Sequence, residues 1–465
     1  MNPKEWPATV KKGFLIHSLS LLLASLSWIR SEKGFRWAYA LIALLAEKLA
    51  KKDYYVQKIR WIKGLFDGNH PSLTVTKNIL RSANPHHRRA IIRALIINQM
   101  LVGTNKRKAF QERSGGFYPP GFFVISPSMK CNLNCYGCYA GYYEKTAELT
   151  FQEIDSVLNQ AKDMGIYFCV VSGGEPLFHP RIFDVYAKHN DVVFHMYTNG
   201  SLINEKTCEQ LKEVGNVIPA ISVEGFREET DDRRGPGHFD RVMKAMDLLR
   251  EMKILFGFSA TLTRQNSEIL NSDEFVDFMI QKGCILGWYF MYVPIGREPN
   301  FQLMPTPEQR GRQVERLTTL RASKPILLAD FWNDGPVVGG CISGGRKYFH
   351  VNANGDVEPC VFCHFATHNI RTSPLKDALN SNLFQSIRCQ LPSYDNLLRP
   401  CIIIDKPAIS RKAISEHQAY FTHDGAEIVY EHLADDIDQY AKEYGHIADA
   451  LWEKYFRTDE KQGSE

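Results

Sequence analysis

The sequence predicts an α/β protein: a partial (β/α)6 TIM-like barrel, preceded by a helical N-terminal region and followed by a small cysteine-containing C-terminal extension. Two observations predict the barrel. From Gly121 onward, short apolar segments alternate with amphipathic segments, and a polar motif follows each of the first four apolar segments. A third observation, a set of five cysteines from Cys341 to Cys401, predicts the extension.

The composition is that of a folded protein from a reducing compartment. The 465 residues suffice for two or three domains, and 44% of them are hydrophobic and 23% charged. Eleven cysteines are an odd number spread over a long chain, which argues against a disulfide-stapled secreted protein. Reduced thiols that bind metal or pack in cores fit better, so we expect a cytoplasmic protein.

The N-terminal quarter is strongly basic. Residues 1–118 contain 21 Lys and Arg against 6 Asp and Glu, a net charge of +15, whereas the rest contains 35 basic and 46 acidic residues, a net −11. Such a block favours an anionic partner. Gly13–Ile29 is uncharged and seventeen residues long, at the short limit for a membrane span. Phe35–Lys52 and Tyr54–Phe66 combine apolar faces with Lys, Arg, Trp and Tyr, as helices in a bilayer interface do.

Two interpretations of this block stay open. It is either a peripheral anchor on the anionic inner face of the cell membrane or a helical subdomain packed on the body of the protein, with His86–Asn98 as a further amphipathic helix. No convincing small-residue cleavage site follows the apolar stretch, which disfavours a signal peptide. No nucleic-acid motif is recognisable, so we expect no nucleic-acid partner.

The alternating region contains six candidate strands. They are Phe122–Ser126, Ile166–Ser172, Val192–Thr198, Val217–Val223, Phe256–Thr263 and Ile285–Val293. The helices between them include Phe151–Met164, Glu205–Glu213, Phe239–Met252 and Asp273–Lys282. In parallel barrels, chemistry collects at the carboxyl ends of the strands. The motifs in question are "CNLNCYGC" after the first strand, then "SGGEP" (Ser172–Pro176), "YTNG" (Tyr197–Gly200) and "SVEG" (Ser222–Gly225). Their common position predicts an active site at this rim.

The first motif places Cys131, Cys135 and Cys138 within eight residues. A disulfide would leave one thiol unpaired. Structural zinc normally takes four protein ligands, and the nearest later cysteine, Cys169, lies inside the apolar "YFCVV". A 4Fe–4S cluster held by three thiolates keeps one iron free for a ligand. The spacing favours the cluster, while zinc and a purely structural role stay open.

Cys-x-x-x-Cys-x-x-Cys followed by "GGEP" resembles the radical S-adenosylmethionine (SAM) superfamily, over roughly Phe122 to Cys401. The resemblance implies that Cys131, Cys135 and Cys138 are the catalytic ligands of a 4Fe–4S cluster whose free iron binds SAM. One-electron reduction would then cleave SAM and release a 5′-deoxyadenosyl radical, which abstracts hydrogen from an unactivated carbon. It further implies anaerobic chemistry and an electron donor such as flavodoxin or ferredoxin.

The resemblance also implies a set of SAM contacts. Gly173 and Gly174 would let the backbone approach the ligand closely, and Glu175 would accept a hydrogen bond from its amino group. The implied contacts to the ribose and carboxylate are Asn199, Ser222 and Glu224. The segment "RRGPGHF" resembles the superfamily's RG-x-G-x-F, so Arg234 would pair with the SAM carboxylate.

Two points qualify these contacts. Arg234 has a structural alternative, a surface ion pair with Asp231 or Asp232. The superfamily usually has an aromatic residue immediately before the third cysteine, where this chain has Gly137 with Tyr136 one position earlier. That departure puts the usual aromatic contact to the adenine edge in doubt.

The C-terminal cysteines resemble the opening of the SPASM/twitch extensions, which hold auxiliary clusters. The set consists of Cys341, Cys360, Cys363, Cys389 and Cys401. Gly355 lies in an Asn-Gly-Asp turn between two short strands, so a hairpin can bring Cys341 near Cys360. We expect one auxiliary 4Fe–4S cluster held by Cys341, Cys360 and two of the other three, with Cys389 or Cys401 alternatively buried. Cys208 and Cys284 carry no motif and are expected in the core.

The expected domains are a basic, partly apolar helical region (1–118), the barrel (119–300), the auxiliary-cluster domain (301–410) and a helical tail (411–465). The aromatic stretches Gly287–Glu298 and Asp330–Gly340 suit an apolar substrate.

Three functions are compatible with the sequence. The first is a radical enzyme, an oxidoreductase or transferase, that abstracts hydrogen from an apolar substrate such as a membrane lipid; its motivation is the basic, apolar N-terminal block. The second is a radical enzyme that modifies a peptide or protein, although no winged-helix peptide-recognition pattern is visible. The third is a non-catalytic iron–sulfur scaffold.

Overall fold

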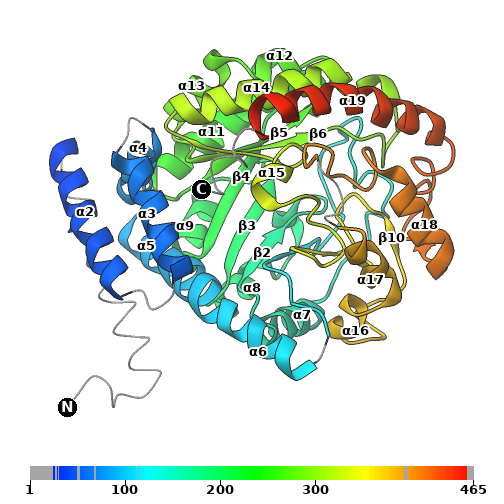
Figure 1. Ribbon diagram of the computed structural model, residues 1–465, viewed down its shortest axis with the longest axis horizontal. Helices are drawn as coiled ribbons and strands as arrows, with labels where there is room; N and C mark the ends of the chain where they lie inside the picture. The colour runs from blue at the N-terminus through cyan, green and yellow to red at the C-terminus, as the bar shows by residue number, and fades with distance from the viewer. Residues whose placement is uncertain are drawn as a thin grey trace.

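The computed structural model describes residues 25–26, 29, 31–49, 53–67, 70–114, 116–391 and 396–457. Within these ranges one nine-stranded sheet has the order β7-β6-β5-β4-β3-β2-β1-β8-β9 (Figure 1). Its first seven strands are β1 (Phe123–Ile125), β2 (Phe168–Val171), β3 (Val193–Thr198), β4 (Val217–Ser222), β5 (Gly257–Leu262), β6 (Leu286–Met291) and β7 (Leu327–Asp330). Each is parallel to its neighbour in chain order, which confirms the predicted barrel-type α/β fold.

Amphipathic helices connect successive strands. They are α7 (Phe151–Asp163), α8 (Ile182–Lys188), α9 (Glu205–Val214), α10 (Arg227–Arg234), α11 (His238–Glu251), α12 (Ser267–Leu270), α13 (Asp273–Lys282) and α14 (Pro307–Ser323). Local sequence fixes where they begin and end. Thr150 and Glu153 form a reciprocal capping box at the start of α7, and Gly215 ends α9 in the left-handed conformation (φ 73°).

The sheet extends beyond the six predicted strands. β7 pairs with β6 in the register Leu286↔Leu327, although it begins after the boundary expected at residue 300. The sequence signal for this strand is weak because it is only four residues long and half of its side chains are buried. The helix α14 directly precedes β7 in the chain, so residues 307–330 pack as part of the barrel.

The C-terminal extension continues the same sheet. β8 (His350–Val351) lies parallel to β1 and antiparallel to β9 (Val357–Glu358), and the Gly355 turn between them has a φ of 89°. The remaining elements are α15 (Gly335–Val338), β10 (Phe365–Ala366), α16 (Leu375–Leu379), α17 (Asn382–Cys389), α18 (Pro407–His417), β11 (Tyr420–Phe421) and α19 (Ala434–Tyr455). The extension is therefore attached to the barrel by a strand ladder as well as by side-chain packing.

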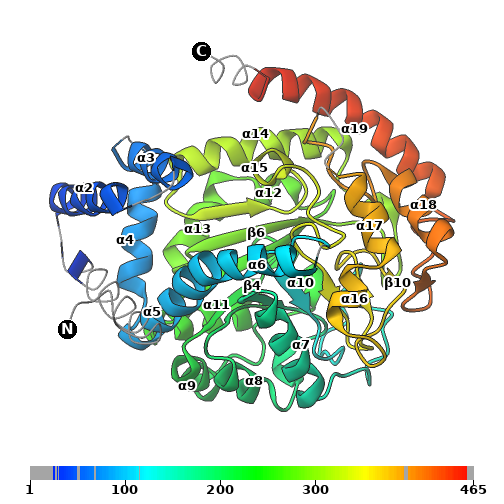
Figure 2. The ribbon, with the colours of Figure 1, turned by 60° about the horizontal axis from the view of Figure 1, so that its bottom comes forward.

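The N-terminal helices begin on the side of the molecule opposite α16–α18, and the last of them runs toward α16 (Figures 1 and 2). They are α2 (Glu32–Leu49), α3 (Asp53–Asp67), α4 (Ser72–Ser82), α5 (Pro85–Ile91), the π-helix η2 (Ile92–Gly103) and α6 (Thr104–Ser114). Asn98 donates to the Asp191 carbonyl (2.7 Å), Gln99 accepts from the Tyr167 amide (2.8 Å), and Arg107 donates to the Gly165 carbonyl (2.7 Å). These partners precede β2 or β3, so η2 and α6 cover the amino ends of the strands.

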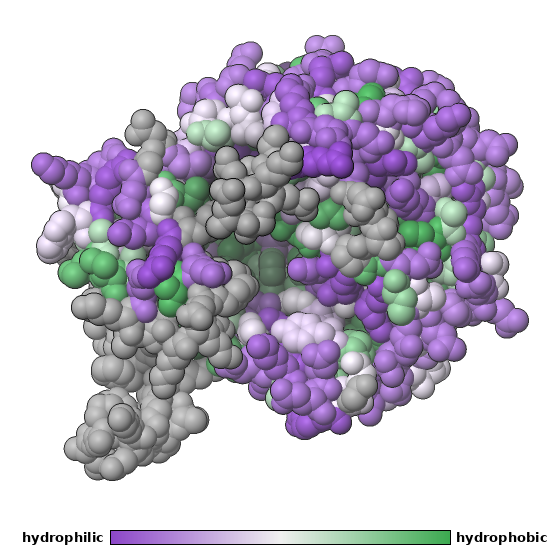
Figure 3. All heavy atoms as spheres, viewed as in Figure 1, coloured by the Kyte–Doolittle hydropathy of each residue, from purple (hydrophilic) through white to green (hydrophobic). Residues whose placement is uncertain are grey.

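The first three helices have a small core of their own, to which Phe35, Phe66 and Leu73 contribute. Trp37, Leu41 and Leu44 on α2 are exposed, and Figure 3 shows apolar side chains over these helices. None of the helices described is long and apolar enough to cross a membrane. Most of the apolar stretch Gly13–Ile29 lies outside the described residues.

A buried ion pair joins barrel, extension and tail. Arg310 of α14 binds Asp405 bidentately (2.6 and 3.0 Å), and its guanidinium lies 3.7 Å from the ring centre of Tyr444 in α19. Both charged side chains are fully buried. Asp405 also accepts from the Cys401 amide (2.9 Å), so this pair holds the segment that presents Cys401.

Candidate active site

A cavity of about 260 Å³ opens at the carboxyl ends of the strands. Its polar side is lined by Cys131, Cys135, Cys138, Gly173, Gly174, Thr198, Asn199, Ser222, Arg233 and Arg234. Residues from four predicted rim motifs therefore meet at one place, together with the two arginines at the end of α10.

The backbone of the cysteine loop is held from two sides. The Cys138 carbonyl accepts from the amides of Gly141 (2.9 Å) and Arg297 (3.0 Å), and the Arg297 side chain donates to the Cys135 carbonyl (3.1 Å). From α10, Arg233 donates to the Gly137 carbonyl (3.3 Å). The loop is thus positioned without relying on its thiols.

The three thiols suit an iron–sulfur cubane better than a single ion. Each is half-buried, and none forms a disulfide. Burial raises the pKa of Cys131, and the charges of Cys138 and Cys135 add to this effect, so the three thiols lie within electrostatic reach. Among the residues described, no three Cys, His, Asp or Glu side chains converge as one metal ion would require. A cubane has no such requirement, because each thiolate binds a different iron.

Gly173 and Gly174 bring "SGGEP" against the cysteine loop. Gly173 has a φ of 109°, and a Cβ there would lie 2.7 Å from the Ser128 carbonyl oxygen. A Cβ on Gly174 would overlap the backbone of Met129 and Lys130. The close approach that these glycines permit is therefore to the chain itself, while both also line the cavity.

The Glu175 carboxylate does not line the cavity. It is fully buried and accepts hydrogen bonds from Thr198 Oγ1 (2.7 Å), the Asn199 amide (2.7 Å) and the Leu177 amide (3.2 Å). Burial raises its pKa to about 7. In this structure Glu175 ties the second rim motif to the third.

Asn199 and Ser222 both line the cavity. Asn199 Nδ2 lies 3.8 Å from Cys131 Sγ and donates to Asn132 Oδ1 (2.9 Å). Ser222 Oγ and Ser259 Oγ are 3.3 Å apart. The positions of these two residues accommodate the polar contacts that the resemblance implies.

Glu224 lies beneath two arginines. Its carboxylate is 1% exposed and accepts from Arg233 (2.8 Å), Arg234 (2.9 Å) and the Thr261 amide (3.1 Å). Burial alone would raise its pKa, but the charges of Arg233 and Arg234 outweigh burial and lower it. Glu224 therefore positions the arginines and does not itself line the cavity.

The surface ion pair considered for Arg234 does not form. Asp231 instead accepts from the amides of Gly237 and Phe239, and Asp232 accepts from Tyr136 Oη (2.8 Å). Arg233, for which no role was predicted, lines the cavity beside Arg234. The only sequence signal for it was its place next to Arg234 in "DDRRG".

The ring of Tyr292 occupies the space beside Gly137, the position where the superfamily usually has an aromatic residue. Gly137 adopts a φ of 60°, and a Cβ there would overlap the ring of Tyr292, which lines the same cavity. The Tyr292 hydroxyl accepts from the Asn300 amide (3.0 Å), which fixes the ring. Tyr136 does not line the cavity and bonds to Asp232 instead.

The remainder of the cavity is apolar. Its wall includes Phe122, Phe168, Tyr197, Trp288, Phe290, Phe331, Ile342, Val361 and Phe362. Members of both aromatic stretches singled out in the sequence, Trp288 and Phe331 among them, contribute to it. Arg233 and Arg234 are the charged side chains among its described lining residues other than the cysteines.

Four C-terminal cysteines surround a second, smaller cavity of about 40 Å³: Cys341, Cys360, Cys363 and Cys401. Tyr348 Oη donates to Cys360 Sγ (2.7 Å). Phe331, Ile342 and Phe362 line both cavities, so they form a shared wall between them. A complete four-thiol set of this kind fits a fully ligated cluster.

Cys389 is not part of this set. It is exposed at the end of α17, whose buried face consists of Leu383, Phe384 and Ile387. Two residues beyond Ile387, the helical period turns Cys389 away from that face. Cys208 and Cys284 are buried in the core, as expected.

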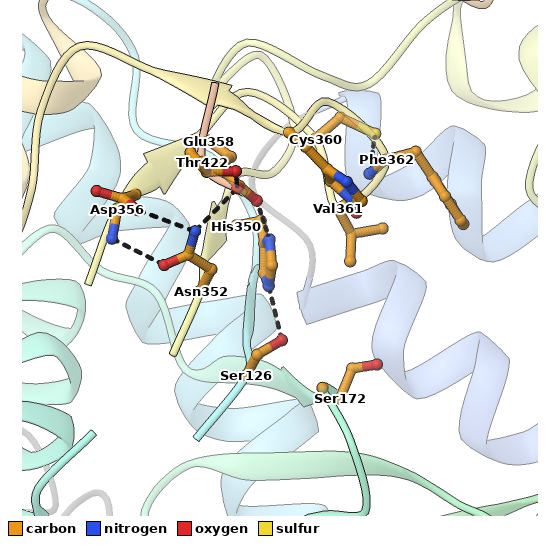
Figure 4. A network of polar contacts seen from close by, with 12 residues as sticks. Ser126, Ser172, His350, Asn352, Asp356, Glu358, Cys360, Val361, Phe362 and Thr422 are labelled. Carbon is orange, nitrogen blue, oxygen red and sulfur yellow. Dashed lines mark hydrogen bonds and ion pairs between the residues drawn. The ribbon is translucent and has the colours of Figure 1, made fainter. Parts of the chain in front are cut away.

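A buried polar network links the end of β1 to the hairpin of β8 and β9 (Figure 4). His350 contacts Ser126 Oγ through Nε2 (2.8 Å) and Glu358 through Nδ1 (2.6 Å). Glu358 also accepts from Thr422 Oγ1 (2.6 Å) and Asn352 Nδ2 (2.9 Å). Because Ser126 follows β1 and Glu358 ends β9, this network fixes the hairpin that leads into Cys360.

Comparison with known proteins agrees with this geometry. Residues 125–275 match the model of the radical SAM superfamily, and residues 341–402 match SPASM, an iron–sulfur cluster-binding domain. An AdoMet-dependent heme synthase of Methanosarcina barkeri is 26% identical over 288 residues, which cover 56% of this chain and 82% of that protein. A PqqA peptide cyclase of Gluconobacter oxydans is 24% identical over 299 residues, covering 61% and 82%.

The fold is shared with a solved structure. The crystal structure of Streptococcus suis SuiB bound to S-adenosylmethionine superimposes with a TM-score of 0.54 at 21% identity, covering 65% of this chain and 76% of that one.

The barrel, its cysteine loop and the matched domain thus define a radical SAM enzyme. Its C-terminal part is a SPASM extension. The enzyme uses a 4Fe–4S cluster with SAM and carries an auxiliary iron–sulfur cluster, so the scaffold hypothesis is not retained.

Proposed function

We propose that this enzyme abstracts hydrogen from a hydrocarbon-like group that enters the apolar part of the larger cavity. When bound, the reduced cluster and SAM supply a 5′-deoxyadenosyl radical. Cys131, Cys135 and Cys138 would hold that cluster, and Gly173, Gly174, Asn199, Ser222 and Arg234 would contact SAM. Glu175 and Glu224 act behind them as positioning residues.

The lining of the cavity is the observation that carries this proposal. Apart from the cysteines and the polar rim, its described wall is aromatic or aliphatic, and its two cations, Arg233 and Arg234, are already paired with Glu224. Because Arg234 would also contact SAM and Arg233 is held by Glu224, a substrate carboxylate would find no cation of its own among the described residues of this wall. A neutral methyl, methylene or aromatic group loses its hydration at little cost here.

An acyl chain of a membrane lipid is the substrate class that we favour. The basic N-terminal block, with Trp37, Leu41 and Leu44 exposed on α2, supports delivery from an anionic membrane surface. A second candidate is an apolar side chain of a peptide, which the similarity to a peptide cyclase favours. The similarity to a heme synthase favours a third class, a tetrapyrrole. A ferredoxin or flavodoxin would supply the electron.

The test uses isotope transfer under anaerobic conditions. The reconstituted enzyme, with dithionite and SAM, is given vesicles of perdeuterated-acyl phospholipid, and deuterium is sought in 5′-deoxyadenosine by mass spectrometry. We expect deuterium transfer with the lipid. Transfer only from a deuterated peptide or from a deuterated tetrapyrrole would overturn the lipid assignment.

A matched pair of variants tests the role of the wall. Trp288→Glu places a charge in the apolar lining and should abolish deuterium transfer, whereas Trp288→Phe should retain it. Cleavage of SAM without substrate should continue in both variants, since Trp288 contributes to the apolar wall and not to the polar rim. Equal transfer by both variants would contradict binding of the substrate at this wall.

A further inference from the structure

The small cavity between Cys341, Cys360, Cys363 and Cys401 has two polar groups beside it that donate to no oxygen or nitrogen atom of the described residues. Trp332 lines this cavity, and its indole Nε1 is buried with no hydrogen-bond acceptor among the described residues. The Tyr430 hydroxyl is likewise buried, and no oxygen or nitrogen atom of the described residues accepts from it. Buried donors are nearly always satisfied in native proteins, so two such donors at one place call for an acceptor.

The surroundings hold both side chains in place. The Trp332 amide donates to Asp330 Oδ1 (3.0 Å), and its ring centre lies 4.8 Å from that of Phe362. The Tyr430 ring lies against Phe421 and Phe365 (centroids 6.0 and 5.6 Å). Neither side chain is free to turn toward water.

The two residues differ from Tyr348, which also adjoins this cavity. Tyr348 already has an acceptor in Cys360 Sγ. Trp332 and Tyr430 come from distant parts of the chain, and the thiols beside them are the sulfur ligands of the auxiliary site. The Tyr430 hydroxyl lies beside the Cys363 sulfur, within hydrogen-bonding reach of it.

We propose that Trp332 Nε1–H and Tyr430 Oη–H donate hydrogen bonds to sulfur atoms of the auxiliary cluster and thereby raise its reduction potential. Hydrogen bonds to cluster sulfurs stabilise the more negative, reduced state. The inference rests on the presence of the SPASM cluster and is independent of the substrate, so failure of the lipid proposal leaves it standing. Both are positioning residues, not catalytic ones.

The test is potentiometry on the full-length protein. Cys131, Cys135 and Cys138 are all replaced by Ala, so that the signal of the auxiliary cluster is observed alone by electron paramagnetic resonance. In this background, Trp332→Phe and Tyr430→Phe retain a ring and remove one donor each. We expect each to shift the midpoint potential to a more negative value, with the iron content per chain unchanged.

Tyr289→Phe is the matched control. Tyr289 is fully buried, but its hydroxyl donates to the Leu270 carbonyl (3.0 Å) and it lines neither cavity. An unchanged potential in Trp332→Phe and Tyr430→Phe, or an equal shift in Tyr289→Phe, overturns the proposal.

A second measurement does not depend on how the variants fold. The protein with Cys131, Cys135 and Cys138 replaced by Ala and no other change, labelled with 15N-indole tryptophan, should show hyperfine coupling of one 15N nucleus to the reduced auxiliary cluster. Absence of this coupling would overturn the assignment of Trp332.

Discussion

At the scale of single residues, the packing of Tyr292 against Gly137 makes a position that tolerates no side chain. A bulky residue there would meet the Tyr292 ring and would also hold a left-handed backbone, which costs about 1–2 kcal/mol for a non-glycine residue. We expect Gly137→Phe to weaken SAM binding by roughly tenfold or more, since 1.4 kcal/mol corresponds to a factor of ten. Equilibrium dialysis of the anaerobically reconstituted protein measures this.

The double variant Gly137→Phe/Tyr292→Ala provides the control. Removing the Tyr292 ring frees the space, so the double variant should recover part of the lost affinity. A double variant as weak as the sum of both single changes would show that the two positions do not share this space.

The elevated pKa of Glu175 predicts a specific dependence of stability on pH. Its carboxyl group has a pKa of about 7 in the folded protein against an ordinary value of 4.5, so between these two pH values the folded state binds more protons than the unfolded state. The contribution of Glu175 to the free energy of unfolding is therefore constant below pH 4.5 and falls as the pH rises to 7, by about 3 kcal/mol in total.

Glu175→Gln should remove this component. The melting temperature of the wild type should fall more steeply from pH 5 to pH 8 than that of the variant. Parallel curves for the two proteins would mean that Glu175 is already ionised at pH 5.

These residues also show what sequence can and cannot predict about the site. The cysteine loop and the glycines were predictable because short spacings and backbone constraints are local. The roles of Arg233 and Tyr292 and the inward direction of Glu175 were not predictable. Each depends on contacts with side chains that are distant in the sequence. Sequence alone likewise did not distinguish Cys401 from Cys389 as a cluster ligand. The structure shows that Cys389 lies on the exposed face of α17, whereas Cys401 lines the second cavity.

At the scale of elements, Arg310 joins α14 to the segment that carries Cys401. Asp405→Asn leaves Arg310 as a buried charge without its counter-ion, which typically costs 3–5 kcal/mol. It also weakens the acceptor of the Cys401 amide. We expect a large fall in melting temperature and a lower iron content at the auxiliary site, measured by calorimetry and iron analysis.

Arg312→Gln on the same helix is the comparison. Arg312 pairs with Glu268 at the surface, with 52% and 69% of the two side chains exposed, so its loss should cost no more than about 1 kcal/mol. A similar loss of iron in both variants would argue that α14 as a whole, and not the buried pair, supports the auxiliary site.

The elements themselves were largely predictable. Six strands and the helices between them lie close to the ranges read from periodicity, because burial on both sides of a parallel strand produces long apolar runs. β7 escaped prediction because only half of its side chains are buried, which leaves a weak apolar pattern. The two short strands on either side of Gly355, β8 and β9, were expected from the Asn-Gly-Asp turn.

At the scale of the whole molecule, charge divides the chain between a basic N-terminal block and an acidic remainder. If the N-terminal helices contact an anionic bilayer, binding to vesicles should require anionic lipid and weaken as salt rises. Co-sedimentation with anionic and neutral vesicles at two salt concentrations measures this. Trp37→Ser/Leu41→Ser should reduce binding, whereas Met100→Ser, an exposed apolar residue on η2, should not.

Equal sedimentation with neutral and anionic vesicles, or unchanged binding by the Trp37/Leu41 variant, would contradict a membrane role for this block. The N-terminal region would then have a structural role, in which η2 and α6 cover the amino ends of the barrel strands.

The pairing of β8 with β1 has a practical consequence for anyone who wishes to divide this protein. A truncation at residue 340 would leave the outer edge of β1 with unsatisfied backbone groups, the kind of surface that recruits other chains into aggregates. The barrel and its metal-binding appendage are thus not exchangeable modules, and a chimera would have to be cut so that the donor supplies its own eighth strand.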